Sequence, residues 1–82
     1  MDEISIYYLE TSIGRSEKWS SIPGVTKENE NILNNIGYGT VKGINFCHYL
    51  NSLNNGYVYG VILISSNYYE YTDKYVVAVY KK

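Results

Sequence analysis

The sequence predicts an α+β domain in which a three- or four-stranded, mainly antiparallel sheet carries two short helices on one face. Three observations lead to this fold class. Residues 57–80 are rich in β-branched and aromatic side chains, residues 27–54 carry apolar side chains at helical spacing, and residues 3–9 alternate as a strand does. Because the chain has 82 residues, we expect a single domain over residues 1–82 with a modest core.

The first element is expected to be a strand over residues 3–9. Ile4, Ile6 and Tyr8 would share one of its faces, because successive side chains of a strand point to opposite sides. Residues 10–25 show no sustained period and contain two glycines and the only proline, so an irregular connection is predicted there. A connection of this length in a small domain is either functional or wrongly assigned.

Two helices are predicted between this connection and the C-terminal strands. The first covers residues 27–36, with Thr26 as its N-cap and Gly37 as its C-terminal stop. The second covers residues 44–54, where apolar side chains recur at the spacing of one helix face. Residues 38–43 are expected to form a turn or a short strand.

The C-terminal part is expected to be entirely β structure. Residues 57–65 form its first strand, because β-branched and aromatic residues fill it. Two arrangements are open for residues 66–80. In a meander, residues 68–72 pair back as a further strand before residues 75–80; otherwise residues 66–74 form one long loop that joins two strands. The composition slightly favours the meander.

Both of these C-terminal strands are apolar on both of their faces. An antiparallel sheet with one covered face should alternate apolar and polar side chains, and residues 57–64 and 75–80 do not. Both faces are therefore expected to be covered. The helices can cover one face, and the other requires residues 10–25, a second copy of the chain or a partner protein.

Tyrosine is the most distinctive residue type, with eleven copies, of which seven fall in the last 26 positions. Its large apolar ring and polar tip suit a surface that must bind and yet stay in solution. We therefore expect a contact surface for a protein partner, built on the tyrosine-rich sheet. The expected partner-binding residues are Tyr57, Tyr59, Tyr68, Tyr69, Tyr71, Trp19 and Arg15.

Trp19 and Arg15 belong to this set because both residue types are enriched at interface hot spots. They are four residues apart, so one helical turn around residues 16–19 would bring them together. An equal alternative is that Trp19 covers the sheet and that Arg15 pairs with a nearby acid.

No catalytic, cofactor-binding or metal site is expected. Cys47 and His48 are adjacent, but neighbours on a helix point about 100° apart, so the thiol lacks a base within reach. One cysteine and one histidine also fall short of a closed zinc site. The glycines of residues 37–43 do not follow the spacing of the dinucleotide-binding fingerprint. An enzyme is therefore disfavoured.

The charge of the chain bears on nucleic acid as a partner. Residues 56–61 are loosely similar to the aromatic strand with which RNA-recognition domains stack bases. The formal net charge is −1, whereas proteins that neutralise many phosphates carry a basic surface. Nucleic acid is therefore disfavoured, and a domain that binds a small ligand, a nucleotide or RNA by aromatic stacking is the alternative function.

The sequence also indicates a compartment and a source. Cys47 is the only cysteine, which fits a reducing cytosol, and the N-terminus lacks the basic start and apolar run of a signal peptide. Uninterrupted apolar runs such as residues 61–64 are far too short to span a membrane. A cytoplasmic protein is therefore expected. Asn, Ile, Tyr and Lys are abundant while Ala and Pro occur once each, which indicates an AT-rich genome.

In its size, its AT-rich residue usage and its lack of catalytic residues, the chain resembles small phage or mobile-element proteins that block a host factor, including anti-CRISPR and other anti-defence inhibitors. The resemblance implies a non-enzymatic interaction protein in the cytoplasm of a bacterial host. Its expected partner is a host defence protein, and a homodimer is the other expected association.

Overall fold

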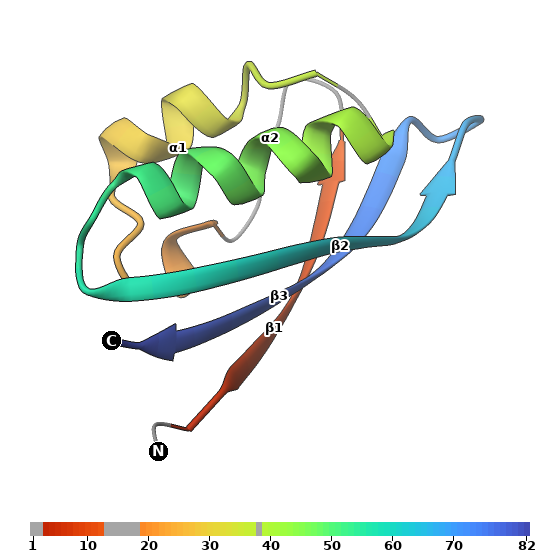
Figure 1. Cartoon of the computed structure of the whole chain (residues 1–82). Helices are drawn as coiled ribbons and strands as arrows, with labels where there is room; N and C mark the ends of the chain where they lie inside the picture. The colour runs from red at the N-terminus through yellow and green to blue at the C-terminus, as the bar shows by residue number, and fades with distance from the viewer. Residues whose placement is uncertain (1–2, 13–18, 38) are drawn as a thin grey trace.

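The computed structural model shows an α+β domain, described for residues 3–12, 19–37 and 39–82 (Figure 1). This result confirms the predicted fold class, with three strands in the sheet. The elements follow the order β1 (Ser5–Ser12), η1 (Trp19–Ser21), α1 (Lys27–Leu33), α2 (Gly39–Ser52), β2 (Tyr57–Asn67) and β3 (Thr72–Lys81), where η1 is a single 3-10 turn.

The three strands form one antiparallel sheet in the order β1-β3-β2, so the last strand of the chain is the central one. The register places Leu9 of β1 and Leu63 of β2 on either side of Tyr75 in β3. Such rows repeat along the sheet, and one irregularity interrupts β2 between Leu63 and Ser65. Because side chains alternate along a strand, the residues of one row all point to the same face.

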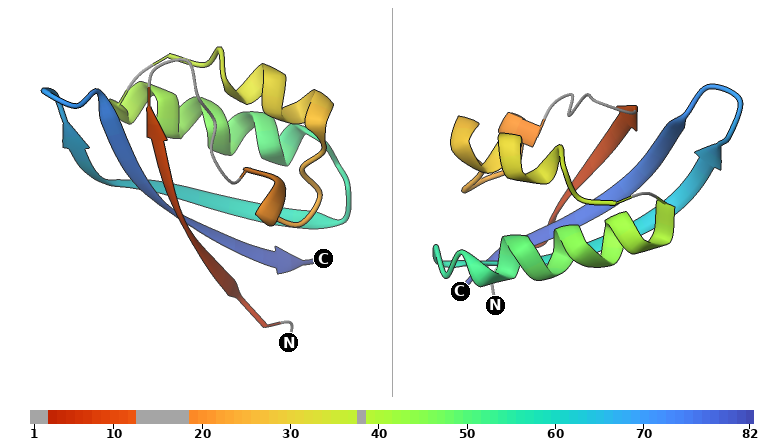
Figure 2. Two further views of the ribbon diagram at one scale, coloured as in Figure 1. Left: turned by 180° about the vertical axis from the view of Figure 1, so that it is seen from behind. Right: turned by 90° about the horizontal axis from the view of Figure 1, so that it is seen from above.

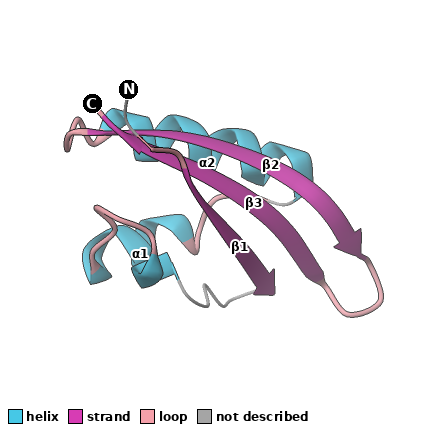
Figure 3. Cartoon of the chain, turned by 90° about the horizontal axis from the view of Figure 1, so that it is seen from below, coloured by secondary structure: helices cyan, strands magenta, loops and turns pink. Residues whose placement is uncertain are grey.

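Both helices lie on one face of this sheet, as the two further views show (Figure 2). Seen from the sheet side, α2 runs along β2, whereas α1 lies on the side of β1 (Figure 3). The core between the layers is built around three aromatic rings. Phe46 of α2 meets Trp19 edge to face at 4.4 Å and Tyr75 at 5.6 Å. The remaining buried apolar side chains are Leu9, Ile22, Leu33, Leu50, Tyr59, Val77 and Val79.

The first helix begins where its sequence predicts but ends earlier, with Asn34 as its C-cap in place of Gly37. The Thr26 hydroxyl accepts a hydrogen bond from the backbone N–H of Asn29 at 3.3 Å, which confirms the N-cap. Gly37 has a φ of 41°, the left-handed conformation expected of a residue that stops a helix. The helix itself is shorter than predicted, because it ends at Leu33.

The second helix begins at Gly39, so the turn or short strand predicted for residues 38–43 is wrong over residues 39–43. The glycines suggested a turn, but packing overrides this local preference. A Cβ atom on Gly43 would lie 3.2 Å from Cε1 of Tyr75, so glycine lets the helix approach the sheet closely. Lys42 is buried beside it, with its ammonium 5.3 Å from the centre of the Phe46 ring.

The last two strands form a hairpin, and the favoured meander is therefore wrong. The residues 68–71, expected to begin a further strand, form the turn instead. The Asn67 side chain fixes this turn, since its oxygen accepts hydrogen bonds from the backbone N–H groups of Tyr69 at 3.0 Å and Glu70 at 3.1 Å. The alternative of two strands joined by one loop agrees better with the structure, although the observed loop is shorter than the predicted residues 66–74.

A side chain of α2 closes the outer edge of β2. The Asn51 amide accepts a hydrogen bond from the backbone N–H of Tyr59 at 2.8 Å and donates one to its carbonyl at 2.9 Å. The Cys47 thiol donates to the same carbonyl at 3.4 Å. Asn51 thus does for Tyr59 what a residue of a neighbouring strand would do. Unpaired edge strands invite further pairing, so this contact protects β2 from it.

We predict that Asn51→Ala lowers the free energy of unfolding by about 1–3 kcal/mol, because both hydrogen bonds to Tyr59 are lost. Urea denaturation measures the change. Asn45→Ala is the matched control, since it gives the same gain in helix propensity at an exposed site of the same helix. Equal effects of the two substitutions would show that the edge contact adds no stability.

The buried ionisable groups make stability fall at alkaline pH. Burial raises the pKa of Tyr75, and the Asp73 carboxylate raises it further. Burial also raises the pKa of Tyr59, against a smaller opposing effect of the Asn55 hydrogen bond. In the unfolded chain tyrosine ionises near pH 10, so above about pH 10 the folded state keeps protons that the unfolded state has lost.

We therefore predict that the free energy of unfolding decreases as the pH rises above about 10. Burial lowers the pKa of Lys42, with Asp73 opposing, so this group acts in the opposite direction below about pH 10. Urea titrations at a series of alkaline pH values measure the slope. Tyr75→Phe removes one of the two phenols and should make that slope shallower; an unchanged slope would contradict the assignment to Tyr75.

Candidate functional site

The structure separates the expected partner-binding residues into two groups. Trp19 and Tyr59 are 0 % and 2 % exposed, so their rings belong to the core and the expectation that they line a surface is corrected. Tyr57 is half-buried, with its ring centre 6.3 Å from that of Tyr59. Tyr68, Tyr69 and Tyr71 are exposed. Arg15 lies outside the described residues.

The physical reason for this correction is the alternation of side chains along β2. Tyr57 and Tyr59 have the same parity as Val61 and Leu63, and all four pack toward the helices. The Tyr59 hydroxyl also donates to the backbone carbonyl of Pro23 and accepts from the Asn55 amide. It is therefore tied to the segment before α1.

Three exposed tyrosines gather in the hairpin turn, residues 67–72, which we call the tyrosine turn. Their rings contact one another: the centre of Tyr68 lies 6.2 Å from that of Tyr69 and 5.9 Å from that of Tyr71. Tyr69 is 93 % exposed and Tyr68 78 %. Tyr71 has a φ of 54°, a left-handed backbone conformation that is uncommon for a residue other than glycine.

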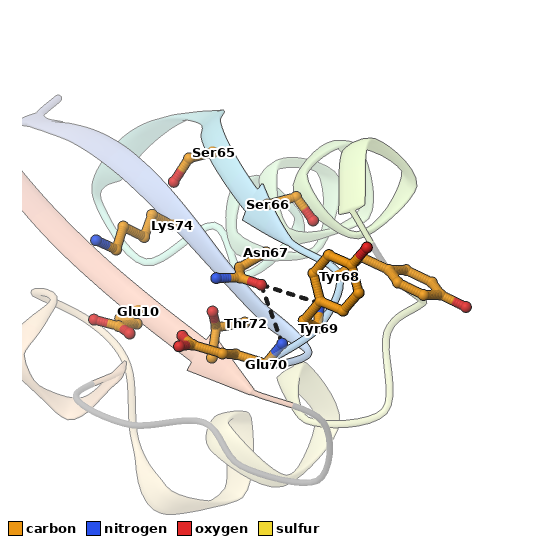
Figure 4. Close-up of a pocket in the computed structure, with 9 residues that line it drawn as sticks. All are labelled: Glu10, Ser65, Ser66, Asn67, Tyr68, Tyr69, Glu70, Thr72 and Lys74. Carbon is orange, nitrogen blue, oxygen red and sulfur yellow. Dashed lines mark hydrogen bonds between the residues drawn. The ribbon is translucent and has the colours of Figure 1, made fainter.

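A shallow depression of about 530 Å³ lies between the tyrosine turn and the neighbouring strands (Figure 4). Its walls combine polar side chains with the rings of Tyr68 and Tyr69, and its charged groups are two carboxylates and one ammonium. Glu10 and Lys74 stand opposite each other in the β1–β3 register. The lining residues are Glu10, Ser65, Ser66, Asn67, Tyr68, Tyr69, Glu70, Thr72 and Lys74.

A second surface is the sheet face that points away from the helices, which we call the open sheet face. Six large apolar side chains on it are between 42 % and 73 % exposed. Within residues 3–12, 19–37 and 39–82, no element covers it; of the connection, Trp19 and Ile22 pack on the helix side instead. These six are Ile4, Ile6, Tyr8, Ile62, Ile64 and Tyr80.

None of these six residues was in the predicted set. The apolar character of both strand faces did signal the surface, as did the shared face of Ile4, Ile6 and Tyr8. Which face points away from the helices depends on the strand order, however. The sequence pattern cannot distinguish the two faces, because both carry apolar side chains. Choosing tyrosines as markers of the surface therefore selected the wrong face of β2.

The residues considered for chemistry occupy structural positions. Cys47 is partly buried, and its thiol donates a hydrogen bond to the backbone carbonyl of Tyr59. His48 is exposed. Across the described ranges, His, Cys, Asp and Glu side chains do not gather in groups of three or more that could hold a metal ion. In the same part of the chain, no helix has the length and apolar character needed to cross a membrane.

The tyrosine turn and the open sheet face are thus the two surfaces with unusual composition. Comparisons with protein-family models, with curated proteins and with solved structures find no match for this chain.

Proposed function

We propose that this domain is a non-enzymatic protein-interaction module that binds another protein through the tyrosine turn. One observation carries the proposal: Tyr68, Tyr69 and Tyr71 are all more than half exposed and meet on a single turn. Covering an exposed aromatic ring with a partner contributes strongly to binding, and tyrosine is enriched at interface hot spots.

The residues around the three rings support this role. Residues 65–71 read Ser-Ser-Asn-Tyr-Tyr-Glu-Tyr, a composition like that of antibody binding loops. There, tyrosine supplies rigid contact area with few rotatable bonds, and serine and asparagine supply adaptable hydrogen bonds. The turn presents both kinds of group to solvent at the end of a hairpin.

The turn is also held in one conformation before any partner arrives. The Asn67 side chain bonds two backbone N–H groups within it, and the Ser66 hydroxyl donates to the Asp73 carboxylate at 2.6 Å across the hairpin. A surface that is ordered in advance loses less entropy on binding. The left-handed backbone of Tyr71 fits this view, because strained residues gather at functional sites.

The finer proposal, inhibition of a host defence protein, rests on the size and residue usage of the chain. The alternative, stacking of a nucleotide or RNA base on the tyrosines, has less support from the charges. Glu10 and Glu70 outnumber Lys74 in the depression, so phosphate groups would meet net negative charge there.

A variant in which Tyr68, Tyr69 and Tyr71 are all replaced by Ser tests the proposal. Immobilised wild-type protein in a bacterial extract is expected to retain one protein in stoichiometric amount, and calorimetry with that purified partner should show at least tenfold weaker binding by the variant. Ile32→Ser, which removes an exposed apolar side chain from α1, is the control and should bind normally. Retention of nucleotide or RNA by the tyrosines, seen by absorbance, would overturn the proposal.

Tyr71→Gly separates binding from stability. Glycine adopts a positive φ without strain, so we predict that the free energy of unfolding rises by about 0.5–1 kcal/mol. Partner binding should weaken because one of the three rings is lost. Thermal denaturation and calorimetry measure the two effects. A less stable variant would mean that the Tyr71 ring, through its contact with Tyr68, holds the turn together.

A further inference from the structure

We infer that the open sheet face is the interface of a homodimer, in which two copies of the chain pack these faces together as a sandwich of sheets. This inference is independent of the tyrosine turn, because it concerns the apolar body of the sheet and not the turn at its end. It is carried by the exposed apolar area, by a hollow at Gly60 and by the match between the two halves of the face.

The exposed apolar area is large for a chain that stays alone. Two of the six exposed side chains are tyrosines, which each bury roughly 150–250 Å² when they are covered, and with the four isoleucines the patch amounts to several hundred Å². Monomeric proteins rarely expose more than a few hundred Å² in one patch, whereas a standard interface buries about 800 Å² per partner. With the half-buried Val58 and Val76 added, the face reaches the size that a stable dimer needs.

Gly60 makes a hollow on the β2 side of this face. The register places Ile6, Ala78 and Gly60 in one row, so the side chains shrink from β1 toward β2. A Cβ atom on Gly60 would meet nothing within 4 Å, and its φ is not among the positive ones. Neither the backbone nor the packing of the single domain therefore requires glycine there. Glycine inside a strand often marks the close approach of another molecule.

The face is complementary to itself. A two-fold axis parallel to the central strand β3 places β1 of each copy over β2 of the other, because the strand order is β1-β3-β2. Each row then lies against the same row of the second copy, reversed. Ile6 of one copy comes to lie opposite Gly60 of the second copy, and Ala78 opposite Ala78. The largest side chain of the row thus fills the hollow.

The neighbouring rows agree with this packing. Tyr8, Val76 and Ile62 form the next row, which gives apolar side chains opposite apolar side chains after the rotation. The row beyond it holds Glu10, Lys74 and Ser65, and the rotation sets Lys74 opposite Lys74 of the second copy. The Glu10 carboxylate beside each Lys74 compensates this pair of like charges at the end of the face. Two sheets packed in this way keep their strands within about 30° of each other.

Analytical ultracentrifugation of the purified chain tests the inference. The expected species has twice the chain mass of 9.4 kDa. Gly60→Asp places a charge in the interface without a clash inside the domain, and it should weaken dimerisation at least a hundredfold. Thr40→Asp adds the same charge at an exposed site on α2 and should leave the dimer unchanged. Circular dichroism checks that each variant is folded.

The sharpest test exchanges the two facing residues, Ile6, whose side chain fills the hollow, and Gly60, which forms it. We call the Ile6 side chain the knob. Ile6→Ala removes the knob and Gly60→Val fills the hollow, so each alone should weaken the dimer at least tenfold. The double variant restores the match and should dimerise within about threefold of wild type, which would be a coupling that only facing residues produce.

The inference would be overturned by a wild-type chain that stays monomeric, by a dimer that Gly60→Asp does not affect, or by a face that binds a different protein instead of a second copy. The variant with all three turn tyrosines replaced by Ser should still dimerise, so the two proposals fail separately. If that variant became monomeric, the dimer would use the tyrosine turn and not the open sheet face.

Discussion

The burial of Tyr75 is the constraint on which the rest of the structure depends. Its ring lies at the centre of the central strand, under Phe46 of α2, and next to Gly43, which has no side chain to hold the helix away. Because this ring must point toward the helices, the parity of β3 is fixed, and the register transmits that parity to β1 and β2. The exposure of Ile6, Tyr8, Ile62 and Tyr80 on the other face is the direct consequence.

The outer edge of β2 is protected by a side chain, and this protection bears on how the chain associates. The Asn51 amide pairs with the backbone of Tyr59, so α2 protects the β2 edge from a further strand. Pairing of strands at that edge would have to break this contact. Packing of one open sheet face on another leaves it intact. The sandwich therefore disturbs the folded domain less than strand pairing at the β2 edge would.

The sequence was sufficient for the fold class, because composition and periodicity are local properties. It was also sufficient for the Thr26 cap, where the chemistry of a single residue decides. It failed where a tertiary contact decides. The glycines before Phe46 read as a turn until Tyr75 is placed against Gly43. In the same way, Tyr59 could be assigned to the core only once the strand order was known.

The tyrosines show how one residue type serves two purposes in one chain. The hydroxyls of Tyr59 and Tyr75 have partners inside the domain, Pro23 and Asp73, so their rings can be buried without loss. The tyrosine turn lies at the end of the hairpin, where rings have no core to enter. In a dimer whose axis is parallel to β3, the two tyrosine turns lie at the same end of the sandwich. One partner with a repeated site would then meet both turns at once, and its apparent affinity would exceed that of either turn alone.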